Sequence, residues 1–306
     1  MNPCVFVAKY FLNKMHKAGF VNIIGNPNVG KSTLMNCFLG EKLSIVTPKA
    51  QTTRHRIMGI LNDENYQVVF SDTPGIINPK YKLQEQMMHF IELALEDADI
   101  FILISEIHET FEHNKILETL KKSGLPVIVL LNKIDLSKQD EVIAKSEAWK
   151  KQFPNWYVLP LSALQGYNIS MVLDKIIELL PEHPPYFPKD QVSDKPVRFF
   201  ISETIREKIL FNYKKEVPYS VEVTVESYKE TEELISIRSI IYVARDSQKA
   251  ILIGHQGKAL KNIGTQARQE LENFLEKQVF LELHVKVSKN WRENESKLRN
   301  FGYIQK

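Results

Sequence analysis

Cysteines are scarce in this sequence and long apolar runs are absent, and each shortage excludes a class of protein. Only Cys4 and Cys37 are present among 306 residues, too few for a disulfide framework, so a reducing cytoplasm is the expected setting. The longest apolar runs, at 100–104 and 127–131, fall far short of the roughly 20 residues that a membrane-spanning helix needs. The net charge of +3 implies no partner by itself. A hydrophobic content of 43% excludes a mainly disordered chain.

The first 14 residues lack the features of a secretion signal. MNPCVFVAKYFLNK has a short apolar patch and two lysines, but no small-residue cleavage site follows it, and a strand-like segment comes next. We therefore expect residues 1–14 to be a disordered extension. Met15 is then a candidate for the true start, a hypothesis that a native mass beginning at Met1 would refute.

Proline is concentrated in one segment, which predicts a domain boundary. Five of the 14 prolines lie between residues 181 and 196. Proline fixes φ and moves its predecessor out of the helical region, so this segment is expected to be extended and semi-stiff. The chain then divides into a first domain at 15–180, a linker at 181–196 and a second domain at 197–306.

The first domain alternates apolar strand-like segments with helical patterns. The segments expected to be strands lie at 20–25, 57–62, 66–71, 99–105, 126–132 and 156–162. The helical patterns lie at 31–39, 82–97, 112–122, 139–153 and 168–180. This order predicts an α/β domain with a mostly parallel sheet and helices on both faces. Ligands bind such sheets outside the carboxyl ends of the strands.

The second domain has a different order of elements. A helix at 197–213 precedes strands at 220–227 and 233–245, a helical pair reaching 276 and a strand at 279–287. This α-β-β-α-α-β order predicts a small α+β domain, closed by a short helix, with a Gly-x-x-Gly turn between the paired helices. By itself that turn could be an ordinary glycine turn. From Ile251 to Lys306, ten Lys and Arg face six Glu and no Asp, a mild basic excess.

Residues 25–32, GNPNVGKS, match the phosphate-binding pattern G-x-x-x-x-G-K-[ST] between a strand and a helix. The glycines let backbone N–H groups wrap a phosphate chain, and the next helix points its positive dipole end toward it. Lys31 can reach the β- and γ-phosphates, and the Ser32 hydroxyl can coordinate Mg²⁺.

Residues 72–75, DTPG, follow a later strand. The Asp72 carboxylate can hold Mg²⁺ through a water, and Gly75 can present its N–H to the γ-phosphate. Alone, DTPG would be a plausible turn. After a phosphate loop it indicates the metal and γ-phosphate side of a nucleotide site.

Residues 132–135, NKID, directly follow an apolar run and predict recognition of guanine. The Asp135 carboxylate can accept hydrogen bonds from guanine N1–H and the 2-amino group. Adenine lacks this pair of donors, so a buried Asp135 would discriminate against it. The stem of Lys133 can lie over the base, and Asn132 can tie this loop to the phosphate loop.

Ser162, Ala163 and Leu164 follow the last strand, where the Ala163 N–H could reach guanine O6. SAL alone carries little information, but here it completes a set of four motifs in order at the carboxyl ends of strands. Together the motifs predict a guanine-nucleotide site.

The combination resembles the translation-factor-related GTPases and, with KAQTTRHRI at 49–57 and the second domain, the Era family of bacterial ribosome-assembly GTPases over residues 15–306. This resemblance implies a P-loop GTPase domain followed by a type II KH domain that binds the 3′ end of 16S ribosomal RNA and assists 30S subunit assembly. The GTP-binding residues are then Gly25, Asn26, Pro27, Asn28, Val29, Gly30, Lys31, Ser32, Thr33, Asp72, Thr73, Pro74, Gly75, Ile76, Asn132, Lys133, Asp135, Ser162, Ala163 and Leu164.

The resemblance places the first switch at 40–56 and the second at 73–82. Thr53, with Thr52 as the alternative, is expected to cap Mg²⁺ and the γ-phosphate. The predicted metal set is Ser32, Thr53 and Asp72. The predicted catalytic set is Lys31, Thr53, Asp72 and Gly75.

Ile76 stands where Ras-like proteins place the glutamine that orients the attacking water, so slow intrinsic GTP hydrolysis is expected. Asn28 could help to hold K⁺ beside the β- and γ-phosphates, as in relatives with the PNxGKS pattern. That hypothesis predicts faster hydrolysis in potassium than in sodium.

In KH domains a GxxG turn holds the backbone of about four single-stranded nucleotides beside an apolar groove. The predicted RNA-binding residues are Gly254, His255, Gln256, Gly257, Lys258 and Lys261. The family favours a basic residue inside GxxG, and His255-Gln256 departs from this, which affects the electrostatic grip.

The expected protein is a cytoplasmic monomer that binds GTP and GDP, with Mg²⁺ and K⁺ as cofactors, and in which nucleotide state gates the KH domain. Peripheral contact with the cytoplasmic face of the inner membrane is a further prediction. The alternative is a GTPase whose C-terminal domain docks a protein or membrane partner. A nucleotide-binding assembly protein without turnover, an ATP-using enzyme and a tRNA-modifying GTPase are the other rivals.

Overall fold

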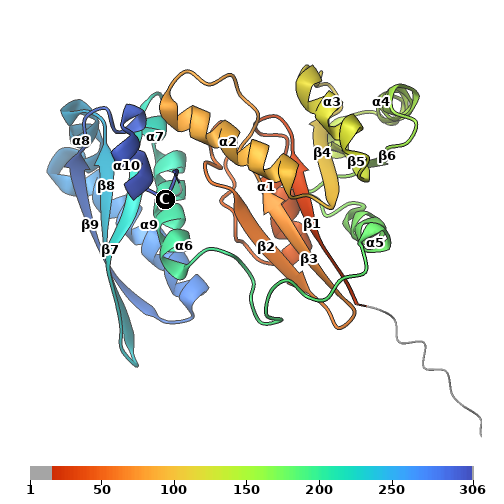
Figure 1. Cartoon of the computed structure of the whole chain (residues 1–306). Helices are drawn as coiled ribbons and strands as arrows, with labels where there is room; N and C mark the ends of the chain where they lie inside the picture. The colour runs from red at the N-terminus through yellow and green to blue at the C-terminus, as the bar shows by residue number, and fades with distance from the viewer. Residues whose placement is uncertain (1–15, 305–306) are drawn as a thin grey trace, which may run out of the picture.

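The computed structural model describes residues 16–304, which form two sheets with their helices (Figure 1). The predicted extension at 1–14 and the candidate start at Met15 lie outside the described residues. No helix within 16–304 is long and apolar enough to span a membrane.

The first sheet has six strands in the order β2-β3-β1-β4-β5-β6. The strands are β1 (Lys17–Ile24), β2 (Ile57–Asn62), β3 (Tyr66–Asp72), β4 (Ile100–Glu106), β5 (Val127–Asn132) and β6 (Tyr157–Pro160). All neighbours pair in parallel except β2, which runs antiparallel to β3 at the edge. The predicted mostly parallel sheet is therefore confirmed.

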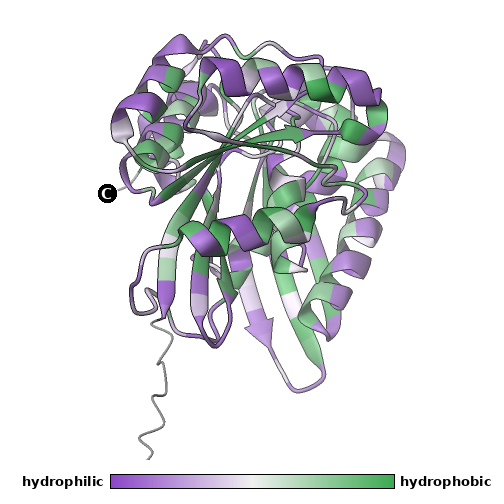
Figure 2. Cartoon of the chain, turned by 90° about the vertical axis from the view of Figure 1, so that its right-hand side faces the viewer, coloured by the Kyte–Doolittle hydropathy of each residue, from purple (hydrophilic) through white to green (hydrophobic). Residues whose placement is uncertain are grey.

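Apolar residues cover both faces of this sheet because successive side chains of a strand point to opposite faces. Ile23 and Ile102 belong to one core, and their neighbours Ile24 and Leu103 belong to the other. In Figure 2, hydrophobic residues colour much of the strands, and hydrophilic and hydrophobic residues alternate along the helices. The helices are α1 (Lys31–Leu39), α2 (Lys82–Glu96), α3 (Asn114–Ser123), α4 (Gln139–Gln152) and α5 (Ile169–Leu179), with a 3₁₀ turn η1 (Ile134–Leu136).

The proline-rich segment contains no helix or strand, as its composition predicts, but it turns near Pro188–Gln191 instead of staying extended throughout, and it packs along the edge of the first sheet. The Ile60 N–H of β2 donates to Val192 O at 2.9 Å, and Ser193 Oγ donates to Met58 O at 2.6 Å. The Gln67 side chain donates to Phe187 O at 2.8 Å. The segment thus satisfies polar groups of an edge strand that would otherwise be open to another chain.

The second sheet has the order β7-β8-β9, with β7 and β8 antiparallel and β8 and β9 parallel. Its elements are α6 (Val197–Asn212), α7 (Val217–Ser220), β7 (Glu222–Glu230), β8 (Leu234–Val243), α8 (Asp246–Ile253), η2 (His255–Gly257), α9 (Lys258–Leu275), β9 (Gln278–Val287), η3 (Trp291–Glu293) and α10 (Glu295–Asn300). This is the predicted α-β-β-α-α-β order. The short helix α7 was not predicted.

Helix α2 packs between the first sheet and the C-terminal end of the chain (Figure 1). Leu83, Met87 and Phe90 of α2 share an apolar cluster with Trp291 and Tyr303. The Trp291 indole N–H donates to Ser220 O at 2.9 Å, which anchors η3 to the end of α7. The two sheets are therefore joined by a buried contact in addition to the proline-rich segment.

Candidate nucleotide site and RNA-binding turn

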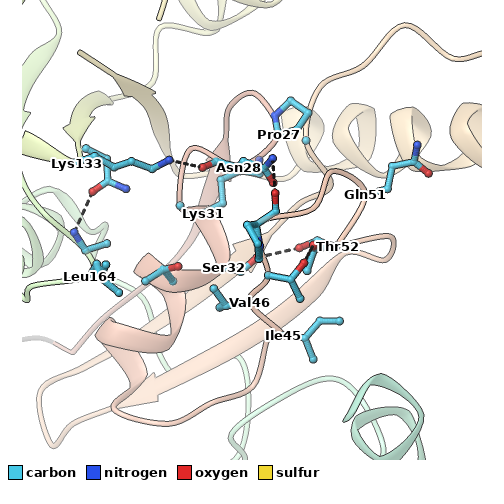
Figure 3. Close-up of a pocket in the computed structure, with 18 of the residues that line it drawn as sticks. Pro27, Asn28, Lys31, Ser32, Ile45, Val46, Gln51, Thr52, Lys133 and Leu164 are labelled. Carbon is cyan, nitrogen blue, oxygen red and sulfur yellow. Dashed lines mark hydrogen bonds between the residues drawn. The ribbon is translucent and has the colours of Figure 1, made fainter. Parts of the chain in front are cut away.

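A cavity of about 470 Å³ opens at the carboxyl ends of the central strands, where the four motifs meet. It is lined by Pro27, Asn28, Gly30, Lys31, Ser32, Thr33, Ile45, Val46, Thr47, Pro48, Gln51, Thr52, Thr53, Gly75, Asn132, Lys133, Asp135, Leu136, Ala163 and Leu164. In Figure 3, Lys133 and Gln51 lie on opposite sides of this cavity, with Asn28, Lys31 and Ser32 between them. The structure thus brings the predicted phosphate-binding and base-reading residues to one place.

The phosphate loop depends on Gly30 for its shape. Gly30 has a φ of +100°, and a Cβ there would lie 2.3 Å from Asn132 Nδ2. Lys31 is buried, and its ammonium donates to Gly25 O at 3.0 Å and Asn26 O at 2.7 Å. Burial lowers the pKa of Lys31 to about 8, despite the nearby carboxylates. A phosphate chain bound in the loop would place negative charge beside this ammonium and so stabilise its protonated form.

Three oxygens predicted to serve Mg²⁺ converge at the start of α1. Ser32 Oγ lies 2.9 Å from Thr53 Oγ1 and donates to Asp72 Oδ2 at 2.7 Å, and Thr53 Oγ1 lies 3.5 Å from the same carboxylate. The other oxygen, Asp72 Oδ1, is buried and has no hydrogen-bond partner among the described residues. Burial raises the pKa of Asp72. This set of hard oxygen ligands, with one carboxylate oxygen buried and without a hydrogen-bond partner among the described residues, fits Mg²⁺.

The structure distinguishes between the two candidate threonines. Thr52 Oγ1 lies 2.6 Å from Thr47 Oγ1 and donates to Lys49 O at 2.6 Å. The Thr52 hydroxyl therefore forms hydrogen bonds within its own loop. Thr53 is the one beside Ser32.

Gly75 meets the phosphate loop closely, since a Cβ there would lie 2.6 Å from Pro27 Cα. The next residue, Ile76, donates its N–H to Gly25 O at 3.2 Å and buries its side chain in the core with Ile24 and Leu103. It is not among the residues that line the cavity, so its contact with GTP stays a prediction.

Thr73 is also structural, because its hydroxyl donates to Ile23 O at 2.7 Å from a fully buried position. Other predicted GTP-binding residues outside the cavity lining are Gly25, Asn26, Val29, Asp72, Pro74 and Ser162. Asn26 directs its side chain away from the cavity, to Glu109 at 2.5 Å and His113 at 2.8 Å.

Asn132 ties the base-reading loop to the phosphate loop, as expected, by donating to Val29 O at 2.7 Å. The Ala163 N–H donates to Asn132 Oδ1 at 2.9 Å and so helps to hold this side chain. Its contact with guanine O6 stays a prediction. Lys133 donates to Asn28 O at 2.8 Å (Figure 3) and pairs with Glu106.

Asp135 was expected to be buried, and it is exposed. It lies in η1 at the mouth of the cavity, so a bound base would itself have to shield this carboxylate. Leu136 and Leu164 flank the same mouth, with 73% and 78% of their surfaces exposed. Leu136 escaped the sequence analysis because a lone Leu after NKID has no distinguishing pattern.

Other lining residues missed by the motif search come from the first switch: Ile45, Val46, Thr47, Pro48 and Gln51. Their position inside the predicted switch range 40–56 was the one available signal. Gln51 has a φ of +59°, and Tyr81 Oη of the second switch donates to its side chain at 3.0 Å.

The GxxG turn lies between α8 and α9 with both glycines at positive φ, +71° at Gly254 and +74° at Gly257. His255, Gln256, Lys258 and Lys261 are exposed around it. A shallow groove of about 370 Å³ continues from the turn, lined by Gly257, Leu260, Lys261, Gly264, Thr265, Arg268, Leu281 and Leu283. Arg268, further along α9, and Leu281 and Leu283 of β9 were not among the predicted residues. Only the folded sheet brings the two leucines beside the turn.

The fold and these two sites define a P-loop guanine-nucleotide-binding domain joined to a KH domain. Residues 20–133 match a family model described as 50S ribosome-binding GTPase, and residues 216–292 match one described as KH domain. The chain is 43% identical over 293 residues to the GTPase Era of Staphylococcus haemolyticus (strain JCSC1435), covering 95% of this chain and 98% of that protein.

Two solved structures are similar over both domains. One is Era in complex with MgGDPNP and nucleotides 1506–1542 of 16S ribosomal RNA, with a TM-score of 0.90, 39% identity and coverage of 95% of this chain and 100% of that chain. The other is a variant of Aquifex aeolicus Era bound to GDP·AlF₄⁻, with a TM-score of 0.91, 39% identity and coverage of 94% and 100%. The chain belongs to the Era family of GTPases, and the predicted family and fold class are confirmed.

Proposed function

We propose that this protein binds and hydrolyses GTP and uses its KH domain to bind the 3′-end region of 16S ribosomal RNA during maturation of the 30S subunit. The observation that carries this proposal is the relative solved with MgGDPNP and 16S nucleotides, which matches this chain across both domains. We also propose the domain division 15–180, 181–196 and 197–306.

GTP hydrolysis follows from how the cavity positions charge. Lys31 and the N-terminus of α1 would hold the β- and γ-phosphates, and Gly75 would donate its N–H to the γ-phosphate. Ser32, Thr53 and Asp72 would hold Mg²⁺, directly or through water. When bound, the ion supplies positive charge against the oxygens that become negative in the transition state. Ile76 is buried and provides no group to orient water, which supports slow intrinsic turnover.

Asn28 is the candidate for a potassium site beside the phosphates. It has a φ of +66°, and its side chain reaches Pro48 O of the first switch at 3.2 Å. An amide oxygen and switch carbonyls are suitable ligands for a monovalent cation.

RNA binding is supported by the open GxxG turn and the groove beside it. A labelled RNA with the last nucleotides of 16S RNA, titrated at several salt concentrations, tests this assignment, because phosphate contacts make affinity fall with salt. The description of the family model for residues 20–133 names the 50S subunit, so co-sedimentation should be measured with both 30S and 50S subunits. Binding to 30S and not 50S is the expected result. Crosslinked nucleotides outside the 3′ end would contradict the proposal.

The alternative is that the C-terminal domain docks a protein or a membrane. We propose a monomer in the cytoplasm, with peripheral contact to the inner membrane as the finer prediction. Co-sedimentation with anionic lipid vesicles, with and without RNA, separates these functions. Binding to vesicles without any RNA affinity would favour the alternative.

A further inference from the structure

The first switch is held in place largely by the C-terminal half of the chain. The Val46 N–H donates to Glu207 Oε1 at 3.3 Å, and the Lys49 ammonium donates to Leu210 O and Tyr213 O at the end of α6. Further along, Arg54 donates to Val221 O at 2.7 Å. This segment carries no helix or strand between α1 and β2, so these contacts do much to determine its path.

One contact reaches the backbone of the switch beside the metal-binding threonine. Arg206 of α6 donates through Nη2 to Thr52 O. Arg206 is 1% exposed, and its guanidinium is oriented by Glu203, which accepts from Nε at 2.7 Å and from Nη2 at 2.6 Å. A guanidinium fixed on one edge by a carboxylate is a preorganised donor, and a charge-assisted hydrogen bond is stronger than a neutral one.

Holding Thr52 O constrains the position of Thr53. The peptide group between the two residues is planar, so the Thr52 carbonyl and the Thr53 nitrogen and Cα lie in one plane. That plane fixes the positions from which the Thr53 side chain starts, so its direction then depends only on rotation about the N–Cα and Cα–Cβ bonds of Thr53. In this structure Thr53 Oγ1 lies 2.9 Å from Ser32 Oγ.

We propose that Arg206 is a positioning residue for GTP hydrolysis: by holding the Thr52 carbonyl, it keeps Thr53 Oγ1 beside Ser32 and Asp72. This inference rests on the proposed role of Thr53 toward Mg²⁺ and the γ-phosphate. Arg206 lies in the KH region and is not among the residues that line the nucleotide cavity. Efficient hydrolysis then requires the C-terminal region to be docked on the switch, so the RNA-binding half completes the GTPase site.

The neighbouring interdomain contacts supply a matched control. Lys42 also bridges the two halves, pairing with Glu207 at 2.7 Å and Glu270 at 2.5 Å. It contacts neither Thr52 nor Thr53, and it is half-exposed. Lys42→Ala therefore removes this half-exposed ion-pair bridge and leaves in place the buried contact of Arg206 with the Thr52 carbonyl.

Two variants remove the proposed contact in different ways. Arg206→Lys keeps a charge for Glu203 but loses the planar fork that reaches Thr52. The double variant Glu203→Gln with Arg206→Met removes both charges, so neither is left buried and unpaired. Both are measured in the full chain, with thermal unfolding and circular dichroism as checks of folding.

The measurements are kcat at saturating GTP, the Mg²⁺ concentration that gives half the maximal rate, and GDP affinity by calorimetry. We expect kcat to fall about tenfold in both variants, because a displaced positioning group costs rate. The half-maximal Mg²⁺ concentration should rise, and excess Mg²⁺ should restore part of the rate. GDP affinity in these variants should stay within roughly twofold of the parent protein, because GDP lacks the γ-phosphate that Thr53 serves. The kcat of Lys42→Ala should also stay within roughly twofold, because that variant leaves the Thr52 carbonyl held by Arg206.

An unchanged kcat in both Arg206 variants would overturn the inference. Equal losses of kcat and GDP affinity, without any shift in Mg²⁺ dependence, would also overturn it, because they indicate a general structural role. If the parent protein itself fails to hydrolyse GTP, the proposed function fails instead, which the same assay shows before any variant is compared.

Discussion

Two glycine turns in this molecule each precede a helix and each face a proposed phosphate ligand, and their surroundings differ. The turn ending at Gly30 is enclosed, since a Cβ there would lie 2.3 Å from Asn132 Nδ2. The turn ending at Gly257 is open, because nothing in the described chain lies within 4 Å of the corresponding Cβ. An enclosed loop can select one nucleotide through fixed partners, whereas an open loop leaves room for a polymer and relies on charge.

The largest effect should come from the buried ammonium of the enclosed turn. Lys31→Ala removes the cation that faces the triphosphate, at a cost of about 2–5 kcal/mol, or roughly 30-fold to several-thousand-fold in affinity. Calorimetry with GDP and GTP measures this loss. Lys258→Ala, at the open turn, serves as the control and should keep nucleotide affinity. Unchanged GTP affinity in Lys31→Ala would refute the nucleotide site.

A methyl group added to each turn compares them directly. Gly30→Ala forces a Cβ against Asn132 and strains a φ of +100°, so we expect a loss of about 2–4 kcal/mol in unfolding free energy. Gly257→Ala strains a φ of +74° without a steric conflict, and the loss should be about 1–2 kcal/mol. Denaturant unfolding measures both. Equal losses would contradict the distinction between enclosed and open turns.

A carboxylate added to the open turn should lower the affinity for RNA and leave the affinity for GTP unchanged. Gly257→Asp places negative charge where a phosphate would approach, so we expect RNA affinity to fall about tenfold or more. GTP affinity should not change. Fluorescence anisotropy with labelled 3′-end RNA measures the effect, with Gly257→Ala as the uncharged control. Normal RNA affinity in Gly257→Asp would refute the KH assignment.

The enclosed turn, unlike the open one, is expected to bind potassium, which should change the rate of GTP hydrolysis. GTP hydrolysis is expected to be several-fold faster in K⁺ than in Na⁺ at equal ionic strength, because a bound cation adds charge stabilisation. Asn28→Gly keeps the positive φ at this position and removes the amide, so it should abolish the difference. Phosphate release measures the rates. Equal rates in the two salts would remove the potassium site.

The smallest effect is a proton exchange at Lys31. Burial lowers its pKa to about 8, and a bound triphosphate should raise it again. At pH 8 nucleotide binding is then accompanied by uptake of about half a proton, which disappears near pH 6, where the ammonium is already protonated. Calorimetry in buffers of different ionisation enthalpy measures this number. No uptake at pH 8 would mean that Lys31 keeps its charge before nucleotide binds.

Most of the fold followed from apolar patterns. The strand predicted at 66–71 is observed at Tyr66–Asp72, and the helix predicted at 82–97 is observed at Lys82–Glu96. Buried parallel strands have short apolar runs in their sequence, and amphipathic helices have apolar residues with a period near 3.6. Local sequence is therefore enough to predict these elements. Helix α7 has four residues, too few to show a period.

The motifs of the site were predicted from the sequence, but the surroundings of several of their residues were not. Ile76, Ala163 and Asp135 occur in the expected places, yet one is buried in the core, one holds a neighbouring side chain and one is exposed. A motif specifies which residues are near a ligand. It does not specify which of their donors and acceptors are already used by the protein.

The sequence by itself determined the two-domain division into a phosphate-loop sheet and a small GxxG domain, because each element carries its own local pattern. Only the tertiary structure decided how the first switch is held. Arg206 and Thr52 are 154 positions apart, and no sequence pattern around either residue predicts that they are in contact. Contacts of that kind depend on how two folded surfaces meet, and this is decided by packing and charge after each domain has formed.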